Sequence, residues 1–237
     1  MTFDSETLAG RLARVRAGIA DACQRAGRDP SDVTLLPVSK TFDAAVVREA
    51  VALDLSRFGE NKVQEIQAKA AALSDERIDW VVIGHLQTNK AKPVAKLAAE
   101  VQSLDRIDLA VALDKALQAE GRGIDVLVQV KTSREPSKFG LDPEALPAFL
   151  HELGAFSSLR LRGLMTLAEP SDDDAVVRGC FRQLYQLRDT ALQAGFSVPR
   201  LSMGMSGDYV QAIAEGSTEV RIGSAIFGAR NYKALQG

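Results

Sequence analysis

The sequence predicts a single (β/α)8 TIM barrel, in which eight parallel strands alternate with helices. Three observations favour this fold. The chain has 237 residues, 46% of them hydrophobic, which is enough for a sizeable core. Strand-like and helical segments alternate eight times, at roughly 24 residues for each pair. No Gly-x-Gly-x-x-Gly sequence follows the first strand, so the open doubly wound sheet is the less favoured alternative.

An extra helix is expected before the barrel, over about residues 5–27, because apolar residues recur there at helical spacing. The barrel should cover about residues 34–228, and residues 1–237 should form one domain. The predicted strands are apolar runs at 35–38, 55–60, 78–84, 101–104, 125–131, 159–166, 200–203 and 219–222. Further helices are expected over 44–52, 61–73, 90–99, 108–120, 143–153, 172–194 and 208–215, the last capped by Ser206.

The composition excludes several classes of protein. A net charge of -2 gives no global attraction to nucleic acid or to an anionic membrane. Cys23 and Cys180 lack metal-ligand spacing and read as reduced thiols, which favours the cytoplasm. No run of about 18 apolar residues predicts a membrane span, and no leader for secretion is indicated. The absence of an obvious apolar seam favours a monomer.

A lysine follows the first predicted strand. Lys40 is either a surface cap or a reactive amine that faces a pocket. In a closed barrel the eighth strand pairs with the first, so the carboxyl ends of strands seven, eight, one and two share a patch about 15 Å across. The residues expected in this patch are Lys40, Asn61, Ser206, Gly207, Arg221, Gly223 and Ser224.

Two segments of this patch are suited to an anion. Ser206 opens a predicted helix and Gly223 follows the eighth strand, where such barrels often bind phosphate. Taken alone, Ser206 is as readily explained as a helix N-cap, and Gly223 as a turn glycine, as by anion binding. With Lys40 nearby they predict an amine beside a phosphate site, which is the arrangement for a Schiff base with a phosphorylated aldehyde. Arg221 adds a fixed positive charge.

Six motifs in order resemble the pyridoxal phosphate homeostasis protein family, also called the YggS or proline-synthase co-transcribed (PROSC) family. They are Val38-Ser39-Lys40-Thr41, 58–61 with 63–65, 83–90, 162–165, 201–206 and 216–228. The resemblance extends from about residue 34 to 232. It implies a barrel like the N-terminal domain of alanine racemase, without the second, β-rich domain of that enzyme.

The resemblance also implies a cofactor, pyridoxal 5′-phosphate (PLP), held as a covalent aldimine on Lys40. Ser206, Gly223 and Ser224 would hold the phosphate, and Arg221 would face the pyridine nitrogen. No catalytic residue and no metal ligand is implied.

Three further residues complete the expected cofactor site. Asn61 would lie beside the ring substituents, and Met165 would pack near the ring face. His85, after the third strand, is either a base or a hydrogen-bonding structural residue. Lys62 departs from the family pattern, in which an aromatic residue is frequent, and this affects local packing more than cofactor binding.

An arginine at the pyridine nitrogen leaves that nitrogen unprotonated, so the ring stabilises carbanions poorly. The resemblance therefore implies a protein of PLP homeostasis that buffers PLP or supplies it to apo-enzymes, with little or no turnover. The alternatives are a low-activity amino-acid racemase and a Schiff-base aldolase acting on a sugar phosphate. Lys131 and Lys138 are either a transient second attachment point for PLP or ordinary loop charges.

Overall fold

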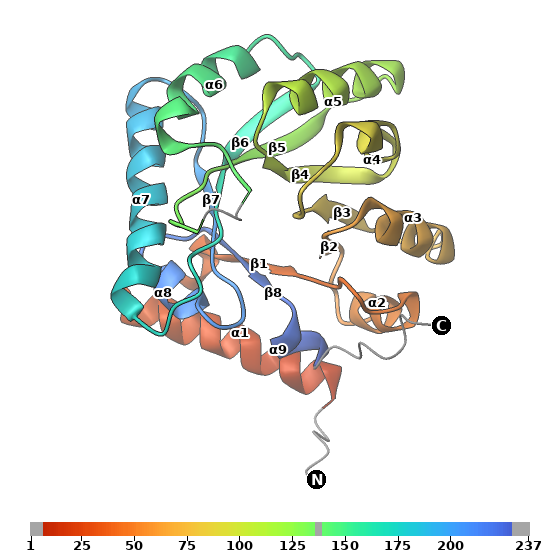
Figure 1. Ribbon diagram of the computed structural model, residues 1–237. Helices are drawn as coiled ribbons and strands as arrows, with labels where there is room; N and C mark the ends of the chain where they lie inside the picture. The colour runs from red at the N-terminus through yellow and green to blue at the C-terminus, as the bar shows by residue number, and fades with distance from the viewer. Residues whose placement is uncertain (1–6, 136–138, 229–237) are drawn as a thin grey trace.

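A computed structural model describes residues 7–135 and 139–228 of the chain. Its strands form one parallel sheet in the order β1-β8-β7-β6-β5-β4-β3-β2, surrounded by helices (Figure 1). The predicted (β/α)8 TIM barrel is therefore confirmed. The strands are β1 (Thr34–Pro37), β2 (Arg57–Glu60), β3 (Asp79–Val82), β4 (Ala98–Leu104), β5 (Ile124–Gln129), β6 (Leu159–Met165), β7 (Arg200–Ser202) and β8 (Glu219–Ile222).

Helices follow the strands at nearly the predicted positions. They are α1 (Leu8–Arg25), α2 (Ala44–Val51), α3 (Val63–Ala72), α4 (Ala91–Leu97), α5 (Ile107–Ala119), α6 (Leu146–Leu153), α7 (Asp174–Gln193), α8 (Tyr209–Ala214) and α9 (Ser224–Phe227), with short 3-10 segments η1 (Pro30–Asp32), η2 (Thr88–Lys90) and η3 (Pro143–Ala145). Asp43 caps α2, because its carboxylate accepts a hydrogen bond from the Val46 amide at 3.0 Å. Within the described ranges, no helix combines the length and the apolar character needed to cross a bilayer.

The two ends of the sheet meet and close the barrel. β1 pairs with β8 in parallel, with Thr34 opposite Glu219. β1 and β2 join through a bridge between Val38 and Gly59, where the Ser39 amide donates to the Gly59 carbonyl at 3.1 Å. A Cβ on Gly59 would lie 3.2 Å from Ile83 and 3.3 Å from Val38, so a larger residue there would crowd this junction.

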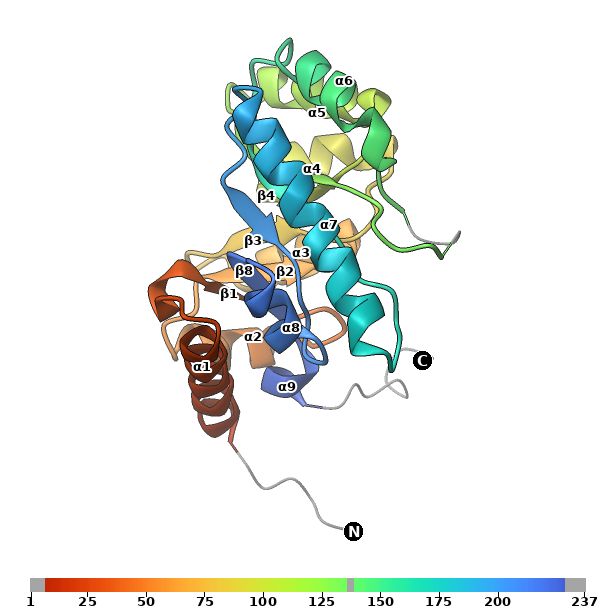
Figure 2. The ribbon, with the colours of Figure 1, turned by 90° about the vertical axis from the view of Figure 1, so that its left-hand side faces the viewer.

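The leading helix α1 lies against the closing end of the barrel, beside α8 and α9 (Figures 1 and 2). The Arg11 side chain donates through Nε to the Ile226 carbonyl of α9 at 2.6 Å. A Cβ on Gly18 would lie 2.5 Å from the Tyr209 hydroxyl, so glycine allows α1 and α8 to approach closely. α1 thus braces the segments that carry β8.

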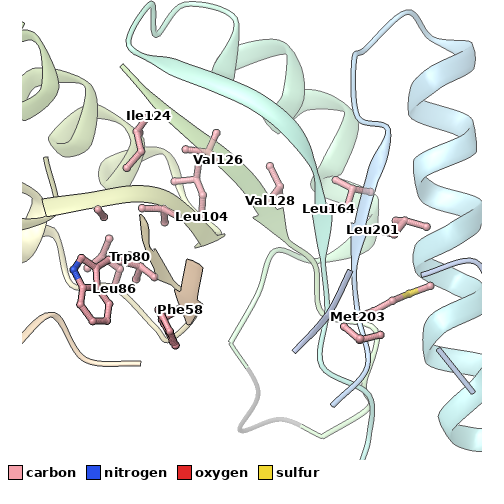
Figure 3. Close-up of a cluster of buried hydrophobic side chains, with 14 of the residues drawn as sticks. Phe58, Trp80, Leu86, Leu104, Ile124, Val126, Val128, Leu164, Leu201 and Met203 are labelled. Carbon is pink, nitrogen blue, oxygen red and sulfur yellow. The ribbon is translucent and has the colours of Figure 1, made fainter. Parts of the chain in front are cut away.

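An apolar layer between the strands and the helices forms the main core (Figure 3). Phe58 and Trp80 pack there with ring centroids 6.1 Å apart. Val126 and Val128 of β5 belong to the same cluster as Leu164 of β6. These are outward-facing positions of the strands, so the helices bury them.

The amino-terminal end of the barrel interior is polar rather than apolar. Glu100 and Glu219 lie there between Arg57 and Arg200, with Arg200 Nη2 2.8 Å and Arg57 Nη1 3.1 Å from Glu219 Oε2. Gln102 Nε2 donates to both glutamates, at 2.7 Å to Glu100 and 2.5 Å to Glu219. Burial raises the pKa of Glu219, but the arginine charges outweigh burial and leave that pKa below its ordinary value.

Most element bounds lie one to three residues from the predicted ones, α9 was not predicted, and two of the differences bear on the barrel and the site. β4 begins at Ala98 and α4 ends at Leu97, although the helix was expected to run to residue 99. The N-cap of α8 is Asp208, so the expected Ser206 cap was wrong. Asp208 instead accepts from the Met205 amide through Oδ1 at 2.5 Å, and this contact closes a turn that contains Ser206.

Candidate functional site

A cavity of about 460 Å³ opens at the carboxyl ends of the strands. Barrels of this fold place their ligand sites at this end, where the loops converge. The cavity is lined by seven of the eight residues that the sequence predicted for the cofactor, which are Lys40, Asn61, His85, Ser206, Arg221, Gly223 and Ser224. Barrel closure therefore brings residues from the two halves of the chain into one pocket.

Met165, the eighth predicted residue, is fully buried in β6 and is not among the lining residues. Leu167, two residues later, lines the cavity instead. Met165 is the last residue of β6 and Leu167 lies in the loop after it, so at this strand the loop, and not the strand end, lines the cavity.

Several lining residues were missed by sequence reasoning. Phe139 lies in the loop after β5. This loop is longer than most βα loops, and its length was the one sign in the sequence of a role at the site. Gln129 of β5 donates from Nε2 to the Phe139 carbonyl at 2.8 Å. Other missed lining residues include Phe42, Ile83 and Met205.

Lys40 lies in a tight turn that follows the bridge between β1 and β2. The Phe42 amide donates to the Ser39 carbonyl at 3.1 Å, which closes a four-residue turn around Lys40. Thr41, at the third position of the turn, has a φ of 71°, in the left-handed region. A β-branched residue is rarely found there, so neighbouring groups must hold this conformation.

Arg221 extends from β8 to the floor of the cavity and is almost fully buried. Its Nη1 donates to Ser202 Oγ and its Nη2 to the Thr166 carbonyl, both at 2.8 Å. Burial lowers the pKa of Arg221 to about 10, so the guanidinium stays charged at neutral pH. Five N–H donors on a fixed plane leave further donors for a ligand.

The loops after β7 and β8 form the side of the cavity suited to an anion. Ser206 and Gly207 come from the first loop, and Gly223 and Ser224 from the second. The Arg221 amide donates to the Gly204 carbonyl at 2.9 Å, which fixes the two loops side by side. The first amides of α9 have no partner within that helix, and both serines add hydroxyl donors.

The loops after β2 and β3 form the opposite side. A Cβ on Gly84 would lie 2.4 Å from the Asn61 carbonyl oxygen, so only glycine allows the Asn61 backbone to pass there. Asn61 therefore lines the cavity instead of capping α3. Lys62, the N-cap of α3, is exposed and is not a lining residue, so its departure from the family pattern lies outside the cavity.

His85 stacks on Phe139 at the edge of the cavity, with ring centroids 3.9 Å apart and planes inclined by 18°. Its Nδ1 lies 3.8 Å from Asp105 Oδ2, beyond hydrogen-bond distance. Lys131 is described but does not line the cavity, and Lys138 lies outside the described residues. Stacking is thus the defined contact of the His85 ring.

Known proteins resemble this chain over nearly its whole length. Residues 11–231 match the family described as alanine racemase, N-terminal domain. A protein of Pseudomonas aeruginosa named pyridoxal phosphate homeostasis protein is 45% identical over 228 residues, which cover 96% of this chain and 98% of that protein.

Solved structures extend the comparison to the fold. PipY of Synechococcus elongatus, with PLP bound, matches with a TM-score of 0.82 at 36% identity and covers 94% of this chain and 100% of that chain. An alanine racemase of Clostridium difficile shares the fold, with a TM-score of 0.69 at 15% identity, covering 89% of this chain and 56% of that chain. By its sequence and its barrel, the chain belongs to the pyridoxal phosphate homeostasis protein family.

Proposed function

We propose that this protein binds PLP through a Schiff base on Lys40 and buffers it or supplies it to apo-enzymes. The observation that carries the proposal is the convergence of Lys40, Arg221 and two anion-suited loops on one cavity of about 460 Å³. The PLP bound to PipY, and the name of the Pseudomonas relative, support the choice of ligand.

The donor set fits the chemistry of PLP. Its phosphate matches the serine hydroxyls and backbone amides around Ser206 and Ser224. Its ring nitrogen would accept a hydrogen bond from Arg221. When bound, PLP supplies an aldehyde that condenses with an amine and a ring that withdraws electrons. Met165 would support the ring only indirectly, through the residues around it.

Little or no catalytic turnover is the second part of the proposal. Arg221 can only donate to the ring nitrogen, so it cannot keep that nitrogen protonated as a carboxylate would. Racemisation also needs a second acid or base on the opposite face of the ring, commonly a tyrosine. Tyr185 and Tyr209 do not line the cavity, and Tyr232 lies outside the described residues.

Titration of the purified protein with PLP tests the covalent attachment. We expect an imine absorbance band, and borohydride should fix the label on Lys40, as read by peptide mass spectrometry. Lys40→Ala should lose both signals, whereas Lys96→Ala, on the exposed side of α4, should keep them. A full band in Lys40→Ala would refute the assignment.

Transfer to a recipient tests the buffering role. The loaded protein should activate a PLP-dependent apo-enzyme, at a rate limited by release from Lys40. Exchange of the α-proton of L-alanine should be no faster than with free PLP. Proton exchange well above that rate would favour the racemase. Size-exclusion chromatography tests the proposed monomer.

A further inference from the structure

The turn that carries Lys40 is held from below by side chains of β2 and α3. Lys69 Nζ donates to the Ser39 carbonyl at 2.8 Å. Glu65 Oε2 accepts from the Thr41 amide at 2.7 Å. These two groups belong to the peptide units immediately before and after the Lys40 Cα. One helix therefore fixes the backbone on both sides of the lysine.

Glu60 anchors the cluster from the end of β2. Its Oε1 accepts from Lys69 Nζ at 2.5 Å and from Ser39 Oγ at 2.6 Å, and all three residues are buried. Lys69 Nζ also lies 3.6 Å from Glu65 Oε2, one helical turn away. The Lys69 ammonium group thus lies between the two acidic side chains and also donates to the backbone of the turn.

Glu65 has a specific task in this arrangement. Thr41 has a φ of 71°, which is unfavourable for a β-branched residue. Such conformations persist where surrounding contacts determine them. The bond from the Thr41 amide to a carboxylate is charge-assisted and is stronger than one between neutral groups.

We infer that Glu65 and Lys69, anchored by Glu60, are positioning residues that aim the Lys40 side chain into the cavity. This inference rests on the proposed attachment of PLP to Lys40. That reaction joins Lys40 Nζ to the aldehyde carbon and releases one water molecule, and it requires the unprotonated amine. The positioning residues do not touch the ligand. They affect the position of Lys40 Nζ relative to the aldehyde carbon of bound PLP.

The test separates the amine from the rest of the pocket by using two probes. PLP reports attachment to Lys40. Pyridoxine 5′-phosphate has the same ring and phosphate but a hydroxymethyl group in place of the aldehyde, so it reports the pocket without the amine. Glu65→Ala removes the acceptor for the Thr41 amide, and Glu65→Gln retains an acceptor oxygen.

We expect Glu65→Ala to lower the rate and equilibrium constant of imine formation about tenfold, because one charge-assisted hydrogen bond is lost. Its affinity for pyridoxine 5′-phosphate should match that of the wild type. Glu65→Gln should retain most of the imine formation. Glu49→Ala removes an exposed glutamate of α2 and serves as the matched control.

A second substitution tests whether Glu65 acts by stabilising the left-handed conformation of Thr41. Glycine adopts positive φ without strain, so Thr41→Gly combined with Glu65→Ala should restore imine formation to near the wild-type level. Lys69→Met should reduce imine formation at least as much as Glu65→Ala, with thermal unfolding recorded to confirm that the variant is folded.

Three results would overturn the inference. The first is wild-type imine formation in folded Glu65→Ala and Lys69→Met. The second is an equal loss of affinity for pyridoxine 5′-phosphate, which would mean general damage to the pocket. The third is no label on Lys40 in the wild type, which would overturn the proposed function as well and is recognised because every variant then lacks the label.

Discussion

Glu219 and Glu60 are both buried strand glutamates, yet their pKa values move in opposite directions. Two arginines, Arg57 and Arg200, face Glu219 Oε2, and Oε1 accepts from Gln102 and Ser202. The pKa of Glu219 is therefore lowered despite burial. Among the described residues, Glu60 Oε2 has no hydrogen-bond partner.

Burial therefore raises the pKa of Glu60 to about 7, and the single charge of Lys69 offsets burial only in part. The comparison teaches that the opposing charges decide the direction of the pKa shift in a buried carboxyl, two arginines at Glu219 and one lysine at Glu60. The cluster at the amino-terminal end of the barrel is a fixed scaffold. In the cluster below Lys40, the raised pKa of Glu60 lies close to neutral pH.

Glu219→Gln should have the largest effect on stability. We expect a loss of about 3–5 kcal/mol near neutral pH, because the substitution removes one carboxylate from two arginines inside the barrel. The lowered pKa means that the stability supplied by Glu219 is present above its unfolded pKa of 4.5 and is lost as the pH falls through its folded pKa. Urea unfolding at several pH values measures both effects, and an unchanged midpoint would contradict the scaffold role.

Comparison with Glu60→Gln should reveal the opposite pH dependence in the stability of the wild type. The folded pKa of about 7 exceeds the unfolded value of 4.5, so the stability linked to Glu60 is complete below 4.5 and is lost as the pH rises through 7. Over this interval the wild type should lose about 3 kcal/mol relative to Glu60→Gln. Parallel stability profiles of the two proteins would show that Glu60 does not titrate in this range.

Lys69→Met should cost less than Glu219→Gln, about 1–3 kcal/mol at neutral pH. Glu60 can take up a proton once its cation is gone, whereas Arg57 and Arg200 cannot lose theirs. The double variant Lys69→Met, Glu60→Gln should recover part of the loss, which a double-mutant cycle measures. Equal losses in Lys69→Met and Glu219→Gln would remove the distinction between the two clusters.

Asp174→Ala should have the smallest effect. The exposed Asp174 pairs with the half-buried Arg178 one turn later on α7, and pairs of this kind near the surface contribute little to stability. The loss should disappear in high salt because exposed charges are screened. A loss comparable with that of the buried clusters would mean that exposure does not separate these ion pairs.

The fold was largely predictable because local patterns agree with the barrel. Asp43 lies before an apolar helical run and caps α2 as expected. Residues 219–222 form β8 with the predicted bounds. Ser206 was assigned the N-cap position that Asp208 occupies, since both residue types are common there and sequence spacing does not separate them.

The site was predictable where strand ends decide it and unpredictable where depth or a loop decides it. Lys40 and Arg221 were expected side by side because closure joins the first and last strands, and both line the cavity. Met165 was expected near the ring face, and Leu167 lines the cavity in the loop after it. Phe139 comes from a loop without a residue pattern of its own. The left-handed conformation of Thr41 could not be foreseen, because the partner of its amide, Glu65, belongs to another element.

The join between β1 and β2 is narrow, and it has a consequence for motion. One bridge, between Val38 and Gly59, spans it in the described structure, two residues before Lys40. A barrel with few hydrogen bonds at one strand junction is expected to open locally at that junction first. Lys40, the proposed attachment point, therefore lies two residues from the part of the barrel wall where the fewest bonds oppose local opening.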